Sequence, residues 1–444
     1  MRNIKGPTQM AMENTVTLER PAWVSEEEFA LVRRKSTGIE WMEGTPEADA
    51  TFFYTDEAHK EGVAINYDEE KAGLPGRDFE LPDPLVFANG RKVSDANDWS
   101  LRRKEILGIF EREVYGRMPP QPESMSFELI SEKVREEFSM VERRYRQWFS
   151  ADGCGPAIDW IVFIPLAAKR PYPFFIHLNY IGNDKIAEGR TNHFPLPLAE
   201  MASRGYAFMS ANYKQISSDG NSVTGTAFDG VFELWGLRDP KRDDNTGSLM
   251  AWAWGLCRGL DLAGRVPELD SGRCAVIGSS RLGKAALLAA AFDERFKACI
   301  PNQTGAIGVQ LMKRDYGESL AAQELNFRWW YCGGVWKWKG REREMPFDQH
   351  MLLACVAPRA LLLECYHKRW FDPVGEFLSA KAASPVWEIL TGKGLGLEEW
   401  PEPYDTVAVR PPLGYVRRKG THGLSPDDWT WAMAFADQVL QGSK

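Results

Sequence analysis

Blocks of apolar residues recur along the chain from about residue 96 onward. Short aliphatic and aromatic runs predict buried strands at 158–166, 173–181, 206–213, 273–279, 298–302 and 360–365. Stretches with apolar residues at near-helical spacing predict helices at 98–115, 195–203, 248–264, 282–292, 349–355, 374–383 and 427–440. Strands that are apolar on both faces and separated by helices are typical of a mostly parallel sheet covered on each side. We therefore predict one α/β domain over residues 96–444.

The first 95 residues follow a different pattern. They are polar and turn-rich, with acidic groups at 25–28 and 68–70. The segment Leu81-Pro-Asp-Pro-Leu85 favours an extended conformation, because a proline disfavours helix in the residue before it. We expect residues 1–95 to form an N-terminal extension packed on the domain.

Charge and hydropathy exclude two classes of partner. The 444-residue chain has a net charge of −8, and its basic runs at 33–35 and 417–419 are short and isolated. A nucleic-acid-binding protein needs a basic stripe. No apolar run approaches the roughly 20 residues of a membrane helix, and no signal peptide is visible at the N-terminus. We expect no nucleic-acid partner, no membrane partner and a monomer.

The cysteines and tryptophans give no sign of a metal or cofactor site. The seven cysteines are scattered, without a Cys-x-x-Cys pair or metal-ligand spacing, so we interpret them as small buried residues with at most one disulfide. We expect no metal and no cofactor. The 17 tryptophans are more than usual, and we expect most of them in the core, although such rings also stack on sugars.

The segment 273–292 holds the candidate nucleophile. An apolar strand leads to Gly278, Ser279 and Ser280, and an Ala- and Leu-rich helix follows directly. A nucleophile elbow needs this order, because the tight turn exposes the serine at the sheet edge. It also directs backbone N–H groups at the positive end of the helix toward a developing oxyanion. Ser280 lies at the apex of the turn, so we prefer it to Ser279.

The spacing of the glycines departs from the usual Gly-x-Ser-x-Gly. The second glycine comes one position late, as Gly278-x-Ser280-x-x-Gly283. The alternatives are a serine-rich turn without chemistry and a phosphate-binding loop. A phosphate loop places Ser or Thr after Gly-Lys, but Ala285 follows Lys284 here. We interpret Ser280 as the nucleophile.

The general base is expected after the nucleophile in the chain, since this fold orders its triad as serine, acid, histidine. Three of the six histidines qualify: His350, His367 and His422. His350 precedes an apolar helix, which indicates a buried structural side chain. His422 lies between Thr421 and Gly423, in a loop before the last helix, and we predict that it is the base.

Several segments together resemble a known family. They are LPDPLVFANG and REVYGRMP within 81–119, AWAWGLCRGLD at 251–261, VIGSSRLGKAALLAAAFDERF at 276–296, DQHMLLACVAPRALL at 348–362, WFDPVGEFLSAKAASPV at 370–386 and GTHGLSPDDW at 420–429. This combination resembles the glucuronoyl esterases, carbohydrate esterase family 15, especially the bacterial branch. The resemblance covers the chain from about Tyr67 to the C-terminus. It implies an α/β-hydrolase fold and a secreted or periplasmic enzyme that cleaves 4-O-methyl-glucuronate esters.

The resemblance also implies roles for individual residues. Ser280 matches the nucleophile, His422 the base, and Arg281 the arginine that supports the oxyanion. The substrate site would include Lys284 and Glu318, which bind sugar hydroxyls, Trp370, which lies over the uronate, and Gln303. The alternative for Lys284 and Glu318 is a solvated surface charge.

The triad acid departs from the family pattern. Family members carry a Glu after the strand that follows the nucleophile, or an Asp after the next strand, but Gln303 and Lys368 occupy these positions here. Three explanations remain open. Glu364 orients His422, which we favour; Asp372 does so, although its position before Pro373 suggests a helix cap; or the site works as a Ser-His dyad with Gln303 or a backbone carbonyl holding the imidazole.

These observations favour one function and leave others open. We predict a serine carboxylesterase acting on small-molecule or polysaccharide uronate esters of plant or algal cell walls, most favourably 4-O-methyl-glucuronoyl esters. A galacturonate methylesterase of pectin, a general serine ester hydrolase or peptidase, and a non-catalytic carbohydrate-binding protein are the alternatives. Acetyl esters are disfavoured, because an acetyl group needs no contacts of the kind that Arg281, Lys284 and Trp370 offer.

Overall fold

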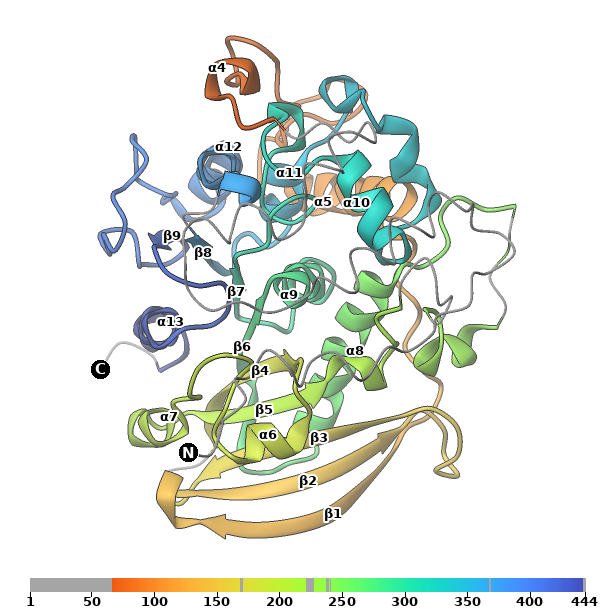
Figure 1. The fold of residues 1–444 in the computed structure, drawn as a ribbon, viewed down its shortest axis with the longest axis vertical. Helices are drawn as coiled ribbons and strands as arrows, with labels where there is room; N and C mark the ends of the chain where they lie inside the picture. Colours follow the sequence, from red (N-terminus) through yellow and green to blue (C-terminus); the bar gives the residue numbers. More distant parts are fainter. Residues whose placement is uncertain are drawn as a thin grey trace, which may run out of the picture.

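A nine-stranded sheet runs through the molecule. The computed structural model describes residues 66–167, 171–220, 227–236, 239, 241–366 and 369–441. The strand order is β1-β2-β3-β5-β4-β6-β7-β8-β9 (Figure 1). The strands are β1 Ser126–Arg135, β2 Met140–Trp148, β3 Ala157–Pro165, β4 Tyr172–Asn179, β5 Ala207–Asn212, β6 Leu269–Ser279, β7 Ala298–Asn302, β8 Ala360–Tyr366 and β9 Leu413–Arg418. Strands β1, β2, β3 and β5 pair antiparallel, and all pairs from β5 to β9 are parallel.

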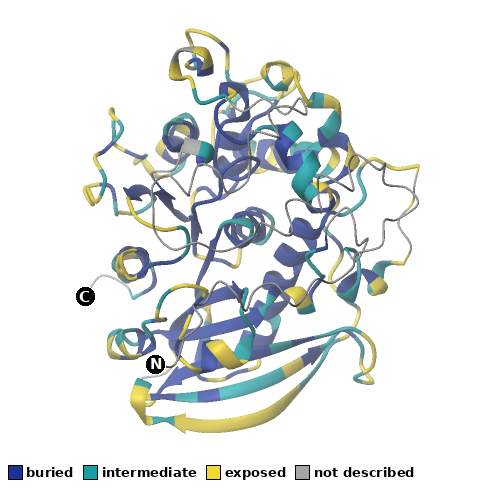
Figure 2. Cartoon of the chain, in the orientation of Figure 1, coloured by how far each residue is buried: buried dark blue, intermediate teal, exposed yellow. Residues whose placement is uncertain are grey.

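The six predicted strands are present as β3 to β8, but the sequence prediction was wrong in omitting β1, β2 and β9. Strands β1 and β2 form an edge hairpin in which β1 is largely exposed (Figure 2). Cross-strand ion pairs such as Glu132–Arg143 stabilise this hairpin, so its sequence lacks an apolar run. Strand β9 is buried throughout although it ends in Arg417 and Arg418, so two of the three residues in the basic run at 417–419 lie in the interior, while Lys419 is exposed.

Helices cover both faces of the sheet (Figure 1). One face carries α8, α9 and, around them, α5, α11 and α12, while α6, α7 and α13 lie on the other. Their bounds are α5 Ala96–Phe110, α6 Asn183–Ala187, α7 Leu198–Arg204, α8 Ser248–Ala263, α9 Arg281–Phe292, α10 Leu320–Phe327, α11 Gln349–Ala354, α12 Pro373–Thr391 and α13 Pro426–Leu440. The seven predicted helices are all present. Helix α12 continues through Pro385 and is therefore longer than predicted.

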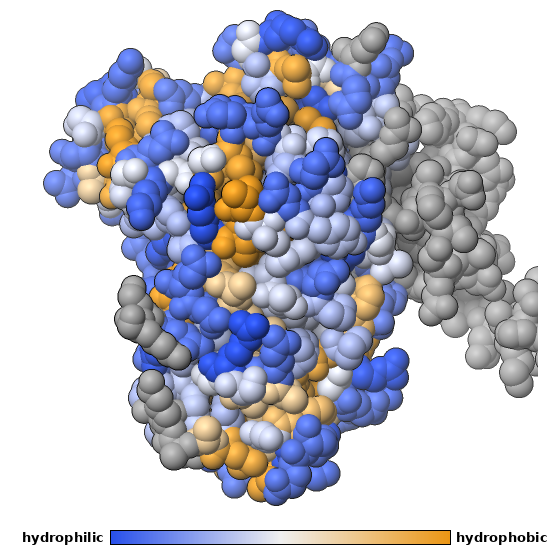
Figure 3. Space-filling view, turned by 90° about the vertical axis from the view of Figure 1, so that its left-hand side faces the viewer, coloured by the Kyte–Doolittle hydropathy of each residue, from blue (hydrophilic) through white to orange (hydrophobic). Residues whose placement is uncertain are grey.

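Two hydrophobic layers sandwich the sheet. Helices α8 and α9 are buried along nearly their whole length, as are the central strands (Figure 2). On the side that carries α7 and α13, hydrophilic residues cover most of the surface, and apolar residues gather in patches in the upper half and near the lower end (Figure 3). Every helix among the described residues is too short or too polar to cross a membrane.

The segment 66–95 lies against the rest of the α/β domain. Arg314 donates a hydrogen bond to the carbonyl of Gly73 at 2.8 Å, and Nε2 of His350 lies 2.7 Å from the carbonyl oxygen of Pro82. His350 is fully buried, and burial lowers its pKa to about 4, so it holds this segment as a neutral side chain. Residues 1–65 of the predicted extension lie outside the described residues. All seven cysteines lie among the residues that the structure describes, and all of them are free, so the single disulfide that the sequence analysis allowed is not formed.

Candidate active site

The strand β6 ends in a tight turn that presents Ser280. Ser280 has φ 58° and ψ −129°, a backbone conformation that is sterically unfavourable for a residue with a side chain. Helix α9 begins at the next residue, so its first N–H groups lie beside the serine. This is the strand–turn–helix context expected of a nucleophile elbow.

The unusual glycine spacing has a steric reason. A Cβ on Gly278 would lie 2.2 Å from the carbonyl oxygen of Leu282, and one on Gly283 would lie 2.8 Å from the carbonyl oxygen of Gly278. The two glycines therefore face each other across the turn, and neither tolerates a side chain. The late second glycine is required by the close approach of β6 and α9, and it supports the assignment of an elbow.

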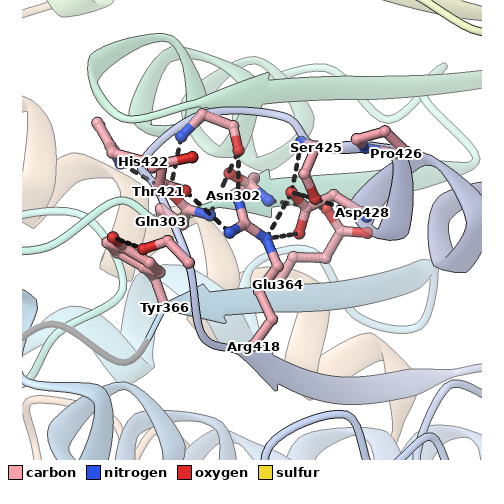
Figure 4. A network of polar contacts seen from close by, with 12 residues as sticks. Asn302, Gln303, Glu364, Tyr366, Arg418, Thr421, His422, Ser425, Pro426 and Asp428 are labelled. Carbon is pink, nitrogen blue, oxygen red and sulfur yellow. Dashed lines mark hydrogen bonds and ion pairs between the residues drawn. The ribbon is translucent and has the colours of Figure 1, made fainter. Parts of the chain in front are cut away.

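His422 is held by Gln303. Nδ1 of His422 lies 2.7 Å from Oε1 of Gln303, and the same Oε1 accepts a hydrogen bond from the backbone N–H of Gly423 at 3.0 Å (Figure 4). A backbone N–H is only a donor, so the amide atom that faces it must be the oxygen. Nδ1 must then carry the proton, which leaves the lone pair of Nε2 available to accept one.

The prediction that Glu364 orients His422 is wrong. The Glu364 carboxyl is fully buried in β8, the strand next to the one that Gln303 follows. There it accepts a hydrogen bond from Nδ2 of Asn302 at 3.0 Å. Burial, together with the nearby Asp428 carboxylate, raises its pKa well above the usual range, which favours the protonated form. Asp372 caps helix α12 and pairs with Arg314, as its position before a proline suggested. Lys368, at the other family position, lies outside the described residues.

Gln303 also departs from its predicted place. The sequence analysis counted it with the substrate-binding residues, but its side chain is buried and its oxygen is used by His422 and Gly423. Its amide group also lies 3.4 Å from the carbonyl of Gly423, to which it donates. The structure thus favours the third explanation left open by the sequence, in which Gln303 holds the imidazole.

The end of β7 connects the nucleophile to the base. The backbone N–H of Ser280 donates to the carbonyl of Asn302 at 2.9 Å, and the next residue is Gln303, which holds His422. The backbone of Ser280 and the imidazole of His422 are therefore held by two consecutive residues at the carboxyl edge of the sheet. Ligand sites of open α/β sheets lie at this edge.

Arg281 is fixed by a buried hub that the sequence analysis missed. Its guanidinium forms an ion pair with Asp219, whose carboxylate also accepts hydrogen bonds from the indole N–H groups of Trp329 and Trp330 at 3.0 and 2.9 Å and from the hydroxyl of Tyr213 at 2.9 Å. Arg281 and these hydrogen bonds keep the pKa of Asp219 below its usual value although burial opposes this. No motif in the sequence marks Asp219, because its partners come from three separate segments.

The Arg281 guanidinium retains an available donor. Its Nε is buried and makes no hydrogen bond to any described residue. The guanidinium carbon lies 4.7 Å from the centre of the Trp330 ring and 5.5 Å from that of Phe327, which stack on each other. A cation fixed in this way beside the nucleophile suits the stabilisation of a negative charge.

Lys284 and Glu318 are not surface charges. Both side chains are buried, which excludes the alternative of a solvated ion. Burial lowers the pKa of Lys284 to about 8, although nearby Glu318 opposes this shift, and burial raises the pKa of Glu318. Glu376 from α12 is the third member of this cluster, and burial raises its pKa to about 8. Such a buried cluster of titratable groups is typical of a functional site.

Trp370 lies beside this cluster. Its backbone carbonyl accepts a hydrogen bond from the N–H of Glu318 at 2.8 Å, and its ring packs against Phe371 with 4.4 Å between centroids. Phe371 in turn lies 5.0 Å from the ring of His422. The fold thus brings Trp370, Glu318 and His422 into one neighbourhood from three distant segments.

Comparison with known proteins identifies the family. A family model described as "Glucuronyl esterase, fungi" matches residues 161–391. A carbohydrate esterase from an unknown prokaryotic organism is 31% identical over 410 residues, which cover 85% of this chain and 93% of the relative. The chain belongs to the glucuronoyl esterase family. As a member it is a carboxylic ester hydrolase, as the sequence predicted.

Solved structures of glucuronoyl esterases show the same fold. A promiscuous esterase of carbohydrate esterase family 15 from a marine bacterial metagenome has a TM-score of 0.75 and 31% identity, covering 84% of this chain and 99% of its own. A glucuronoyl esterase from Solibacter usitatus has a TM-score of 0.73 and 32% identity, with 82% and 99% of the two chains covered. The predicted α/β-hydrolase fold is confirmed.

Proposed function

We propose that the protein hydrolyses esters of uronic acids, with 4-O-methyl-glucuronoyl esters as the preferred substrates, through an acyl-enzyme on Ser280. One observation carries the catalytic part. The backbone of Ser280 and the imidazole of His422 are held by adjacent residues, Asn302 and Gln303, and because the amide oxygen of Gln303 accepts from Nδ1–H, Nε2 is the ring nitrogen that can take up a proton.

Acylation begins when Oγ of Ser280 attacks the ester carbonyl. Nε2 of His422 takes the hydroxyl proton, while Nδ1–H donates to the oxygen of Gln303. The negative charge that develops on the carbonyl oxygen is stabilised by the backbone N–H of Arg281 at the start of α9 and by its guanidinium. The tetrahedral intermediate then collapses, and His422 returns the proton to the leaving alkoxide, which departs as an alcohol.

Deacylation repeats these steps with water. His422 takes a proton from a water molecule that attacks the acyl carbonyl, the same groups stabilise the oxyanion, and Ser280 leaves with the proton that His422 held. The product is the free uronic acid. Gln303 has no negative charge to stabilise the imidazolium. It contributes only by orienting the imidazole ring and by keeping the proton on Nδ1.

The substrate assignment is supported by two kinds of observation. A relative from Wolfiporia cocos, named 4-O-methyl-glucuronoyl methylesterase, is 28% identical over 333 residues, covering 71% of this chain and 74% of its own. In this chain, the buried Lys284 and Glu318 supply a donor and an acceptor near Arg281, and Trp370 supplies an aromatic face. Polar groups beside an aromatic ring suit the hydroxyls and the apolar face of a sugar.

A substrate panel tests the proposal. We expect kcat/KM for methyl and benzyl esters of 4-O-methyl-glucuronate to exceed that for methyl galacturonate and p-nitrophenyl acetate by at least about 10-fold, or about 1.4 kcal/mol of transition-state binding. Preference for galacturonate or for the acetyl ester would refute the substrate assignment. The location follows from the substrate: we propose that the enzyme acts outside the cytoplasm, where cell-wall polysaccharide lies.

A labelling experiment tests the catalytic part separately. A fluorophosphonate should label the wild-type protein and not Ser280→Ala, and Ser280→Ala should lose at least about 1,000-fold in kcat. Equal labelling of both proteins would place the nucleophile elsewhere. An unlabelled wild-type protein without turnover would favour a carbohydrate-binding protein without activity.

A further inference from the structure

The loop that carries His422 is wrapped around a single buried cation. Nη1 of Arg418 donates to the carbonyl of Lys419 at 3.2 Å and to that of Thr421 at 2.8 Å, and Nη2 donates to the carbonyl of Gly423 at 2.6 Å (Figure 4). These carbonyls lie on both sides of His422. Because one planar guanidinium holds all three, their relative positions are fixed together.

Arg418 is itself fixed by the helix that follows the loop. Its Nε lies 2.9 Å from both carboxylate oxygens of Asp428. Asp428 belongs to the first turn of α13, where it forms a capping box with Ser425. Arg418 and Asp428 are both buried, with side-chain exposures of 2% and 0%. The pair therefore joins the end of β9 to the start of α13, and the loop between them has little freedom.

Two neighbours complete the enclosure of the loop. The hydroxyl of Tyr366, from the adjacent strand β8, donates to the carbonyl of Gly420, and the guanidinium of Arg418 lies over the Tyr366 ring with its carbon 5.4 Å from the centroid. Gln303 contacts both the N–H and the carbonyl of Gly423. The backbone carbonyls of residues 419, 420, 421 and 423 thus all accept hydrogen bonds from side chains. The donors are Arg418, Tyr366 and Gln303.

We infer that Arg418 is a positioning residue for His422, and that this ion pair supplies the rigidity that a triad carboxylate would otherwise add. The reasoning rests on the proposed function, in which His422 is the base. In a triad with an acid, charge and geometry both hold the imidazole in place. Here Gln303 is neutral, so orientation of the ring depends on the position of the loop backbone, and Arg418 determines that position. One arginine of the short basic run seen in the sequence therefore serves catalysis from the interior.

The test compares Arg418→Met with a matched variant, Arg103→Met. Arg103 is also a buried arginine: it donates to the carbonyls of Cys355 and Ala291 at 2.8 and 2.5 Å and pairs with Glu294, and none of these partners belongs to the His422 loop. The fraction of active sites is titrated with a fluorophosphonate, so that kcat is expressed per intact site. We expect Arg418→Met to lower kcat per titrated site by about 100-fold, with KM changed by less than about three-fold, because a small displacement of a catalytic group costs about this much. Arg103→Met should keep the wild-type kcat per site.

A double variant separates positioning from general destabilisation. In a His422→Ala background, Arg418→Met should cost no more than about two-fold further in kcat, because the group that it positions is absent. If Arg418→Met does not fold, Arg418→Lys replaces it; lysine keeps the charge without the planar fork, and an intermediate loss of about 10-fold is expected.

The outcomes are distinct. The same loss in the wild-type and the His422→Ala background, or equal kcat per site in the Arg418 and Arg103 variants, would overturn the inference while leaving Ser280 and His422 as catalytic residues. Wild-type activity of Ser280→Ala and His422→Ala would overturn the proposed function, and the inference with it.

Discussion

Replacing Gln303 with glutamate adds the charge that the site lacks. The new carboxylate oxygen would lie where Oε1 of Gln303 now lies, 2.7 Å from Nδ1 of His422. It would accept the same hydrogen bonds from His422 and Gly423, so the tautomer stays as it is. The expected result is a higher pKa of the imidazole and a faster chemical step, since an anion beside the ring stabilises the imidazolium that forms in the transition state.

The magnitude follows from the distance. Two opposite unit charges about 4 Å apart attract by about 4 kcal/mol at an effective dielectric constant of 20. Burying a carboxylate in a site where Gln303 is 1% exposed offsets part of this attraction. We therefore expect the pKa of His422 to rise by about 1 to 2 units relative to the wild type, which corresponds to about 1.4 to 2.7 kcal/mol.

The assay is the pH dependence of kcat/KM. Its acid limb reports the free-enzyme pKa of the base, which must be deprotonated to accept the serine proton. In Gln303→Glu this limb should move to higher pH by about 1 to 2 units, while kcat on the alkaline plateau rises by about 10-fold or more. Gln303→Ala, which removes the hydrogen bond, should lower kcat by about 10- to 100-fold, because hydrogen bonds to charged groups contribute about 1.5 to 3 kcal/mol.

Gln349 provides the matched control. It is a buried glutamine whose Oε1 accepts a hydrogen bond from Tyr115 at 3.2 Å, away from His422. Gln349→Glu should lower stability through the buried charge and leave the acid limb unchanged. An acid limb that does not move in Gln303→Glu, or moves equally in both variants, would refute the idea that position 303 orients the base.

Three further predictions concern the groups around this site. Asp219→Asn breaks the buried ion pair with Arg281, so kcat should fall by about 10-fold in steady-state kinetics, and the free energy of unfolding should fall by about 3 kcal/mol in urea denaturation. An unchanged kcat would show that Asp219 does not support the oxyanion through Arg281. Burial lowers the pKa of Lys284 to about 8, so KM for a uronate ester should rise between pH 7.5 and about 9 as the ammonium loses its proton, and Lys284→Met should have a high KM that does not change with pH; a flat KM in the wild type would contradict this role. Burial raises the pKa of Glu364, so the folded state keeps a proton that the unfolded state loses as pH rises above the ordinary pKa near 4.5. The stability of the wild type should therefore fall with rising pH. Glu364→Gln cannot ionise, so its Tm relative to the wild type should be higher at pH 8 than at pH 5. A constant difference in Tm would show that Glu364 does not titrate in this way.

Local sequence determined much of the fold and indicated the candidate nucleophile. The strands β3 to β8 are short, apolar and buried on both faces, so their positions follow from composition and spacing alone. Ser280 could be predicted as the nucleophile because a strand, a small-residue turn and a helix are adjacent in the chain. His422 was predicted as the base from the order of the triad in this fold. The edge hairpin β1–β2 was missed because ion pairs between strands, which no single segment reveals, replace apolar contacts there.

The partner of the base was decided only by the tertiary structure. Glu364 lies in β8 opposite Asn302, and Gln303 directly follows β7, so both are near the same edge of the sheet. The sequence favoured Glu364 because a carboxylate usually orients the histidine of a triad. A hydrogen bond requires agreement within a few tenths of an ångström between side chains that are 119 positions apart in the chain. The same holds for Asp219 with Arg281 and for Arg418 with the loop carbonyls. Residue type and spacing determine which groups are present at the edge of a sheet, but packing of distant segments determines which of them meet.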